Sequence, residues 1–345
     1  MDKVRIGFVG VGNMGQAAHL RNYASLGECD VTAIAEIRPH LREAVARKFA
    51  IPKTYETAAQ MLASESLDGI VASQPFERHG SIITPLYQAG IPIFTEKPLA
   101  ASVRVGERML TALAQSSSWH MVGYHKRSDP ATMYAKAEIE RLKASGELGP
   151  LKYVRITMPA GDWVAGGFNE RVTADDPYPP SAEAPDDKPD PEYVRFVNYY
   201  IHQVNLLRHL LGEPYTVTYA DPSQVLLAVQ SQSGVAGVIE MSPYRTTVDW
   251  QETALIAFEK GWIRLDLPAP LAHNRAGRVE MYADPGDGKT PLASSPQLPW
   301  VHAMRQQAIN FVAAIRGERK PPCDAIEALE DLKVAQDYLR LLQGN

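Results

Sequence analysis

The tripeptide Glu96-Lys97-Pro98 puts a basic side chain directly after a run of mostly apolar residues, 90–95, whose composition is typical of a strand. Parallel α/β sheets bind their ligands at the carboxyl ends of their strands, so Lys97 is a candidate for direct contact with a substrate. Its ammonium group can hydrogen-bond a substrate hydroxyl and stabilise an alkoxide as it develops. The alternative is an exposed lysine without a catalytic role, because most lysines lie at protein surfaces.

A second candidate site lies on the segment 192–212, which has the period of an amphipathic helix. Its apolar stripe comprises Val194, Val197, Ile201 and Val204, and its polar stripe comprises Asn198, His202, Asn205 and His209. The imidazole of His202 can then act as a general base at neutral pH. The alternative is a histidine that makes only structural hydrogen bonds. No carboxylate or cysteine joins His202 and His209 at ligand spacing, so we expect no metal site.

Residues 4–15, VRIGFVGVGNMG, join a strand-like run to three glycines spaced as G-x-G-x-x-G. Where such a strand turns into a helix, Gly10 permits the tight turn and Gly12 removes a Cβ that would block a diphosphate. Gly15 lets the helix lie close to the strand, and the first N–H groups of the helix face the anion. The pattern therefore predicts a dinucleotide site, and a glycine turn without a ligand is the alternative.

The next strand-like run, 31–35, leads to Glu36, which stands 21 residues after Gly15, close to the spacing of the ribose-binding acid in such motifs. A carboxylate there can accept hydrogen bonds from the adenosine ribose hydroxyls and would repel a 2′-phosphate, which favours NAD as the cofactor. Arg38 can instead bind that phosphate, so NADP is the open alternative. Arg38 can also be a solvated cation at the start of a helix.

The first 124 residues alternate strand-like runs with helical patterns, as parallel βαβ units do. Strands are predicted within 4–9, 29–36, 67–73, 90–98 and 119–124, with a first helix over 16–26 and a second over 39–49. This order predicts a doubly wound sheet with the nucleotide across the carboxyl ends of its strands.

From about residue 152 the pattern changes to period-two alternation, which predicts a largely antiparallel sheet with one solvated or partner-covered face. The predicted strands are 152–160, 215–220, 224–231, 234–242, 252–260, 261–268 and 279–283. Residues 174–193 are rich in proline and acid, and we expect them to form a flap near the substrate pocket. The tail, 302–343, predicts two helices with a break near Gly317, and Asp324 is the expected cap of the second.

Composition limits the class of protein. The chain has 345 residues, enough for about two domains. A formal net charge of -5 argues against nucleic acid or an acidic membrane as a partner. No apolar run approaches the roughly 20 residues needed to span a bilayer, and the chain enters a strand without a signal peptide. The only cysteines, Cys29 and Cys323, make neither a disulfide framework nor a zinc site. We expect a cytoplasmic protein.

The opening GFVGVGNMG, the Glu96-Lys97-Pro98 tripeptide and the helix that carries His202 together resemble the Gfo/Idh/MocA oxidoreductase family, over essentially the whole chain. The resemblance implies an α/β protein with an N-terminal doubly wound Rossmann domain, 1–124, and a C-terminal α+β domain, 125–345, that has a large, mostly antiparallel open sheet. The last helices can pack back on the Rossmann domain. It also implies a homodimer or homotetramer formed through the C-terminal sheet.

The resemblance further implies an NAD(P)-dependent dehydrogenase or reductase that acts on a hydroxyl or keto carbon of a sugar, sugar derivative or cyclitol. Lys97 would be its catalytic lysine and His202 the histidine that exchanges a proton with the substrate oxygen, with Asn198 beside it. The predicted cofactor-binding residues are Gly10, Gly12, Asn13, Met14, Gly15, Glu36, Arg38, Ser73, Pro75, His79, Glu96 and Lys97. Residues 123–136 resemble the family's G-x-x-x-R-F-x-P segment, and the predicted substrate residues are Lys126, Arg127, Arg195, Asn198 and His202.

The chain departs from the family's helix motif D-x-G-x-H-x-x-D, because Asn198, Tyr200 and Asn205 occupy its D, G and D positions. An asparagine carries no charge, so His202 has less help as a base. Two other functions are therefore open. One is an NAD-dependent glycoside hydrolase that uses transient oxidation with no net redox change, and the other is a non-catalytic nucleotide-binding sensor. If Lys126, Arg127 and Arg195 converge in the fold, they would suit an anionic or highly hydroxylated substrate. The alternative is that all three are exposed cations without a role in substrate binding.

Overall fold

The computed structural model describes residues 2–177 and 190–344. The chain divides into two units, each with its own sheet. The first unit comprises Met1–Tyr124, Gly166–Val194 and Met304–Leu332. The second comprises His125–Ala165, Arg195–Ala303 and Lys333–Asn345.

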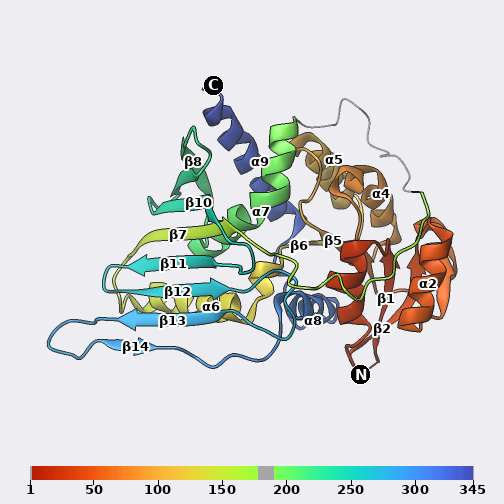
Figure 1. Cartoon of the computed structure of the whole chain (residues 1–345), viewed down its shortest axis with the longest axis horizontal. Helices are drawn as coiled ribbons and strands as arrows, with labels where there is room; N and C mark the ends of the chain where they lie inside the picture. The colour runs from red at the N-terminus through yellow and green to blue at the C-terminus, as the bar shows by residue number, and fades with distance from the viewer. Residues whose placement is uncertain (1, 178–189, 345) are drawn as a thin grey trace. The chain divides into compact units, whose positions relative to one another are not determined.

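The first unit contains a parallel six-stranded sheet with the order β3-β2-β1-β4-β5-β6. Figure 1 labels four of its strands, namely β1, β2, β5 and β6. Its strands are β1 (Val4–Val9), β2 (Cys29–Ala35), β3 (Lys53–Tyr55), β4 (Gly69–Ala72), β5 (Ile93–Glu96) and β6 (His120–Gly123). The strand order reverses between β1 and β4, which is the point where doubly wound sheets bind their ligands. The predicted doubly wound sheet is confirmed, and β3 is a short strand that the sequence pattern did not reveal.

Helices connect these strands, as parallel pairing requires. They are η1 (Gly15–Leu20), α1 (Arg21–Tyr23), α2 (Pro39–Phe49), α3 (Ala58–Ser64), η2 (Phe76–Arg78), α4 (His79–Leu86), η3 (Tyr87–Ala89) and α5 (Val103–Ala114). A further helix of this unit, α8 (Ala303–Ile315), comes from late in the chain. Four aromatic rings join the layers: Phe8 lies 5.5 Å from Tyr23, and Phe311 lies 6.4 Å from Tyr23 and 5.7 Å from Phe94. All four side chains are buried, so apolar burial holds α8 on this sheet.

The turn after β1 needs glycine at Gly10. Its φ is +86°, and an added Cβ would lie 2.6 Å from the carbonyl oxygen of Ser73. At Gly15 an added Cβ would lie 2.9 Å from the carbonyl oxygen of Gly10, so the helix approaches the turn closely. These two roles were expected from the spacing of the motif.

Replacing Gly10 by alanine is expected to lower the free energy of unfolding by about 3 kcal/mol, because the backbone strain and the contact with Ser73 add together. Gly27 is the matched control, since its added Cβ meets nothing within 4 Å. Urea unfolding of both alanine variants measures the difference. Equal, small effects at the two positions would contradict the tight turn.

The second unit contains an eight-stranded sheet with the order β14-β13-β12-β11-β7-β10-β9-β8. Its strands are β7 (Leu151–Ala160), β8 (Tyr215–Ala220), β9 (Leu226–Ser231), β10 (Ala236–Arg245), β11 (Glu252–Phe258), β12 (Gly261–Leu267), β13 (Arg278–Ala283) and β14 (Leu292–Ser294). Pairing is antiparallel except between β7 and β10, which confirms the largely antiparallel sheet. The parallel pair is allowed because a long crossover separates its two strands.

The helical segments of this unit are η4 (His125–Ser128), α6 (Pro130–Ser145), α7 (Pro191–Leu211) and α9 (Ala325–Leu342), of which α7 and α9 begin in the first unit. α6 contacts β12 and β13 (Figure 1), and Leu207 of α7 packs near Gly237 of β10. α6 was missed by the motif-based interpretation of 123–136, although Asp129 caps its start and Gly146 its end, which are recognisable signals.

The predicted break in the tail is confirmed, since α8 ends at Ile315 and α9 begins at Ala325. Asp324 accepts a hydrogen bond from the N–H of Glu327 at 2.8 Å, as expected for its cap. Most of the predicted flap over 174–193, namely residues 178–189, lies outside the described residues. Within the described residues, every helix is too short or too polar to cross a membrane.

Candidate functional site

A groove opens at the carboxyl ends of β1, β2 and β4 in the first unit and encloses about 730 Å³, open solvent included. Its lining residues are Val9, Gly10, Gly12, Ala35, Glu36, Ile37, Arg38, Glu56, Thr57, Ala58, Ser73, Gln74, Arg78 and Ile82. The glycine motif and the acidic residue after β2, which the sequence placed together, meet here.

The groove fits a dinucleotide at its glycine turn. A Cβ added to Gly12 would meet only the Nη2 atom of Arg38, at 3.5 Å, so the backbone is open to a bulky anion from this side. Asn13 is exposed and Met14 is half-buried, at the start of the following helix. The predicted residues of this motif would hold the diphosphate.

Glu36 is buried and makes four hydrogen bonds as an acceptor. Its Oε2 accepts from the N–H of Val11 at 3.0 Å and from Arg38 Nη2 at 2.9 Å, and its Oε1 accepts from Arg38 Nε at 2.7 Å and the N–H of Arg38 at 3.2 Å. Burial by itself would raise the pKa of Glu36. The bonds from Arg38 and Val11 and the guanidinium charge outweigh burial, and they hold the pKa below its ordinary value.

His79 and Pro75 stand at the end of β4, outside the lining of this groove. His79 is fully buried, and its ring nitrogens lie 3.0 Å from the carbonyl oxygen of Leu99 and 3.1 Å from that of Gln74. Burial lowers the pKa of His79 although these two carbonyls favour its charged form. The ring therefore braces the chain after β5 against the chain after β4.

Lys97 directly follows β5 and is half-buried, at the same carboxyl edge as the groove. The preceding Glu96 is buried, and its Oε1 lies 2.6 Å from His19 Nε2, while its Oε2 accepts from the N–H of Lys97 at 3.2 Å. Burial raises the pKa of Glu96, but the His19 contact and the Lys97 charge produce a net lowering. His19 thus anchors the segment that carries Lys97.

In the second unit, His202 on α7 meets His125 of η4. The two ring centroids lie 4.6 Å apart with the rings nearly perpendicular. His202 is half-buried and Asn198 is exposed. Arg195 is also exposed and donates to Gln224 Oε1 at 3.0 Å. The described residues contain no cluster of three or more histidine, cysteine, aspartate or glutamate side chains suited to a metal.

Lys126 and Arg127 are both buried, with 4% of each residue exposed. They are therefore not the solvent-exposed cations that the sequence left as an alternative. Lys126 forms an ion pair with the buried Glu252 at the start of β11. Arg127 Nε donates to Asn205 Oδ1 at 2.6 Å. Asn205, at the second aspartate position of the helix motif, therefore holds η4 against α7.

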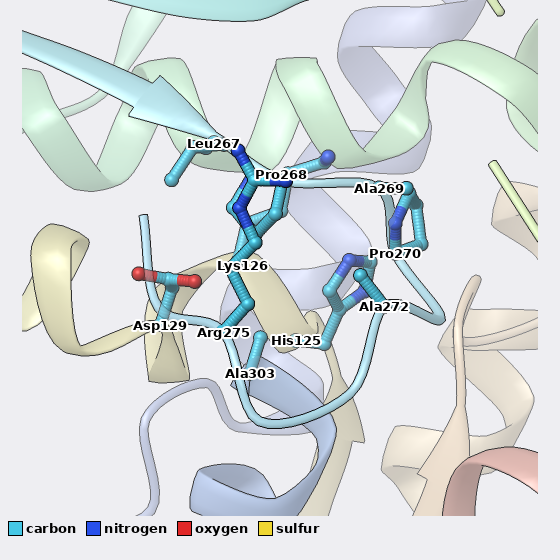
Figure 2. Close-up of a pocket in the computed structure, with 10 residues that line it drawn as sticks. All are labelled: His125, Lys126, Asp129, Leu267, Pro268, Ala269, Pro270, Ala272, Arg275 and Ala303. Atoms are coloured by element: carbon cyan, nitrogen blue, oxygen red, sulfur yellow. The ribbon is translucent and has the colours of Figure 1, made fainter. Parts of the chain in front are cut away.

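A small pocket of about 270 Å³, open solvent included, lies beside Lys126 (Figure 2). It is lined by His125, Lys126, Asp129, Leu267, Pro268, Ala269, Pro270, Ala272, Arg275 and Ala303. The loop after β12 supplies the proline-rich part of its wall. Asp129 caps α6 and accepts hydrogen bonds from the N–H groups of Ala131 and Gly277, at 2.8 and 3.0 Å. Burial nevertheless raises the pKa of Asp129 to about 6.

Because the pKa of Asp129 is raised, we expect its contribution to the free energy of unfolding to decrease as the pH rises from 4 to 6. The folded state binds the proton more tightly than the unfolded chain, so the contribution of Asp129 is present at pH 4 and is lost above pH 6. In the wild-type protein the free energy of unfolding is expected to fall by an amount on the order of 3 kcal/mol over this range. Asp129→Asn keeps an acceptor oxygen but cannot titrate, so this variant is expected to lack the fall. Urea unfolding between pH 4 and 7 measures it, and identical pH profiles for the two proteins would refute the shift.

Three buried residues of these sites were missed by the sequence analysis: His19, His125 and Glu252. His19 is 77 positions from Glu96, and Glu252 is 126 positions from Lys126, so no local spacing signals either pair. His125 stands inside the quoted segment 123–136, where its neighbours Lys126 and Arg127 were chosen for their charge.

Known proteins resemble this chain in sequence and in fold. Residues 4–124 match the Gfo/Idh/MocA profile, an oxidoreductase family with an NAD-binding Rossmann fold. The chain is 24% identical over 331 residues to the inositol 2-dehydrogenase of Rhizobium meliloti, which covers 90% of this chain and 88% of that protein. It is 26% identical over 260 residues to the scyllo-inositol 2-dehydrogenase (NAD(+)) of Bacillus subtilis, with 70% and 67% covered. The crystal structure of an oxidoreductase domain protein from Kribbella flavida has a TM-score of 0.76 at 21% identity, with 100% of this chain and 98% of that chain covered.

Proposed function

We propose that this chain, whose residues 4–124 match the Gfo/Idh/MocA oxidoreductase profile, is an NAD(P)-dependent dehydrogenase or reductase acting on a hydroxyl or keto carbon of a cyclitol or sugar. The observation that carries the proposal is the position of Lys97. It follows β5 at the carboxyl edge of the parallel sheet, the edge at which the groove beside the glycine turn opens. Relatives that act on inositols support the substrate class.

A bound nicotinamide would supply the hydride acceptor or donor. Residues of the chain would bind the substrate oxygen and transfer its proton. Lys97 would donate a hydrogen bond to the substrate oxygen and stabilise negative charge on it, and the pair of Glu96 and His19 would keep the lysine's segment in place. His202 would accept the hydroxyl proton during oxidation and return it during reduction. Contact with the buried His125 restricts the orientation of its ring.

The proposal is tested by incubating the purified full chain with NAD or NADP and a panel of inositols, sugars and glycosides while following the absorbance of the reduced cofactor. Steady accumulation of reduced cofactor with one of these compounds supports the dehydrogenase. Product without net reduced cofactor would instead establish the glycoside hydrolase that uses transient oxidation. Dinucleotide binding without turnover of any compound would favour the non-catalytic sensor.

A further inference from the structure

The acidic residue after β2 is already occupied by donors from its own chain. The four hydrogen bonds to Glu36, from the N–H of Val11 and from three N–H groups of Arg38, range from 2.7 to 3.2 Å. An ionised carboxylate offers about four acceptor positions, so these donors use them all. Ribose hydroxyls can bind Glu36 only by displacing one of the donors.

Arg38, in contrast, presents its guanidinium to the groove. The side chain is 18% exposed, lines the groove and lies with Nη2 at 3.5 Å from the place of a Cβ on Gly12. Arg78 lines the same groove after β4 and is buried. The guanidinium of Arg38 therefore borders the space beside the glycine turn, and guanidinium is the side-chain group that best matches phosphate oxygens in geometry.

We propose that Arg38, oriented by Glu36, binds the 2′-phosphate of the dinucleotide, so that this chain takes NADP(H) at least as tightly as NAD(H). The inference rests on the proposed function, because it concerns the cofactor of that same site. It assigns Glu36 a different role from the one that favoured NAD, since the carboxylate orients an arginine and does not itself bind the ribose.

The charges of the groove permit this assignment. Four charged residues line it, namely Glu36, Glu56, Arg38 and Arg78. The bidentate pairing offsets the charge of Glu36, and Glu56 is exposed, so solvent and salt screen its repulsion. With Arg78, the lining carries as many cations as carboxylates.

Calorimetric titration of the full chain with adenosine 2′,5′-bisphosphate and with 5′-AMP isolates the 2′-phosphate, because the two probes differ only in that group. We expect at least tenfold tighter binding of the bisphosphate, and NADPH bound no more weakly than NADH. In Arg38→Ala the affinity for the bisphosphate and for NADPH is expected to fall by about 10- to 100-fold, as for a lost charge-assisted hydrogen bond, while that for NADH changes by less than about threefold.

Arg42→Ala is the matched control. Arg42 also bonds to Glu36, at its main-chain oxygen, 2.6 Å away, yet it is absent from the described lining of the groove. We expect its affinities for all four compounds to be unchanged. Glu36→Gln completes the set, and under this proposal it changes NADH affinity by less than about threefold.

Four outcomes would overturn the inference. Tight NADH binding with NADPH bound more than tenfold more weakly would leave the proposed enzyme intact and refute the phosphate site alone. Equal loss of both reduced cofactors in Arg38→Ala, or a loss of NADH binding above tenfold in Glu36→Gln, would do the same. Failure of the folded protein to bind any dinucleotide would remove the proposed function as well.

Discussion

Replacing Lys97 by alanine is expected to lower kcat/KM by about 10³-fold, while the Kd of the dinucleotide changes by less than about threefold. The size of the effect follows from removing a cation that stabilises charge only as it develops on the substrate oxygen. Binding persists because the groove is built from the glycine turn, the end of β2 and the end of β4, none of which includes Lys97. Steady-state kinetics and calorimetric titration of the same preparation measure the two quantities.

Lys53→Ala is the control for Lys97, since Lys53 belongs to the same unit and is exposed at the start of β3. It should leave both quantities unchanged. Lys97→Arg keeps the charge but changes its shape and hydrogen bonding, so activity should stay well below the wild-type level. A parallel loss of turnover and of dinucleotide binding in Lys97→Ala would make this lysine a cofactor ligand only, and the proposed role on the substrate oxygen would be wrong.

The second large effect is expected at Glu252, where alanine should lower the unfolding free energy by about 3–5 kcal/mol. Its carboxylate is buried and accepts from Lys126, from Gln203 Nε2 at 2.8 Å and from Trp250 Nε1 at 3.2 Å. Truncation would leave the Lys126 ammonium buried without its counter-ion, which costs far more than the pair itself contributes. Urea unfolding at neutral pH measures the loss.

Two further variants separate the explanation from a general sensitivity of this region. Glu259→Ala, which removes an exposed carboxylate 3.9 Å from Lys152, should cost less than about 1 kcal/mol. Adding Lys126→Met to Glu252→Ala should recover much of the stability, because no buried charge is then left over. A cost below about 1 kcal/mol for Glu252→Ala alone would show that the ammonium reaches water by another route.

The sequence by itself determined the layers of this protein. Hydrophobic periodicity is repeated over many residues, so single exceptions do not hide it, and it predicted both sheets and most of their strands. The spacing of Gly10, Gly12 and Gly15 was equally informative, because a positive φ and a close approach of backbones each exclude a Cβ. The position of Lys97 at the end of β5 followed from the same pattern.

Only the tertiary structure decided which charged groups meet. Lys126 was chosen from sequence as a substrate cation, yet the fold buries it against Glu252 from a distant strand. Glu36 and Arg38 are two positions apart, and sequence treated them as rivals for the cofactor, whereas the fold pairs them. The physical reason is desolvation, because a buried charge is costly unless an opposite charge or a hydrogen-bond partner lies next to it. Long-range packing decides which residue that partner is. The type of a single residue therefore does not predict its partner in the folded chain.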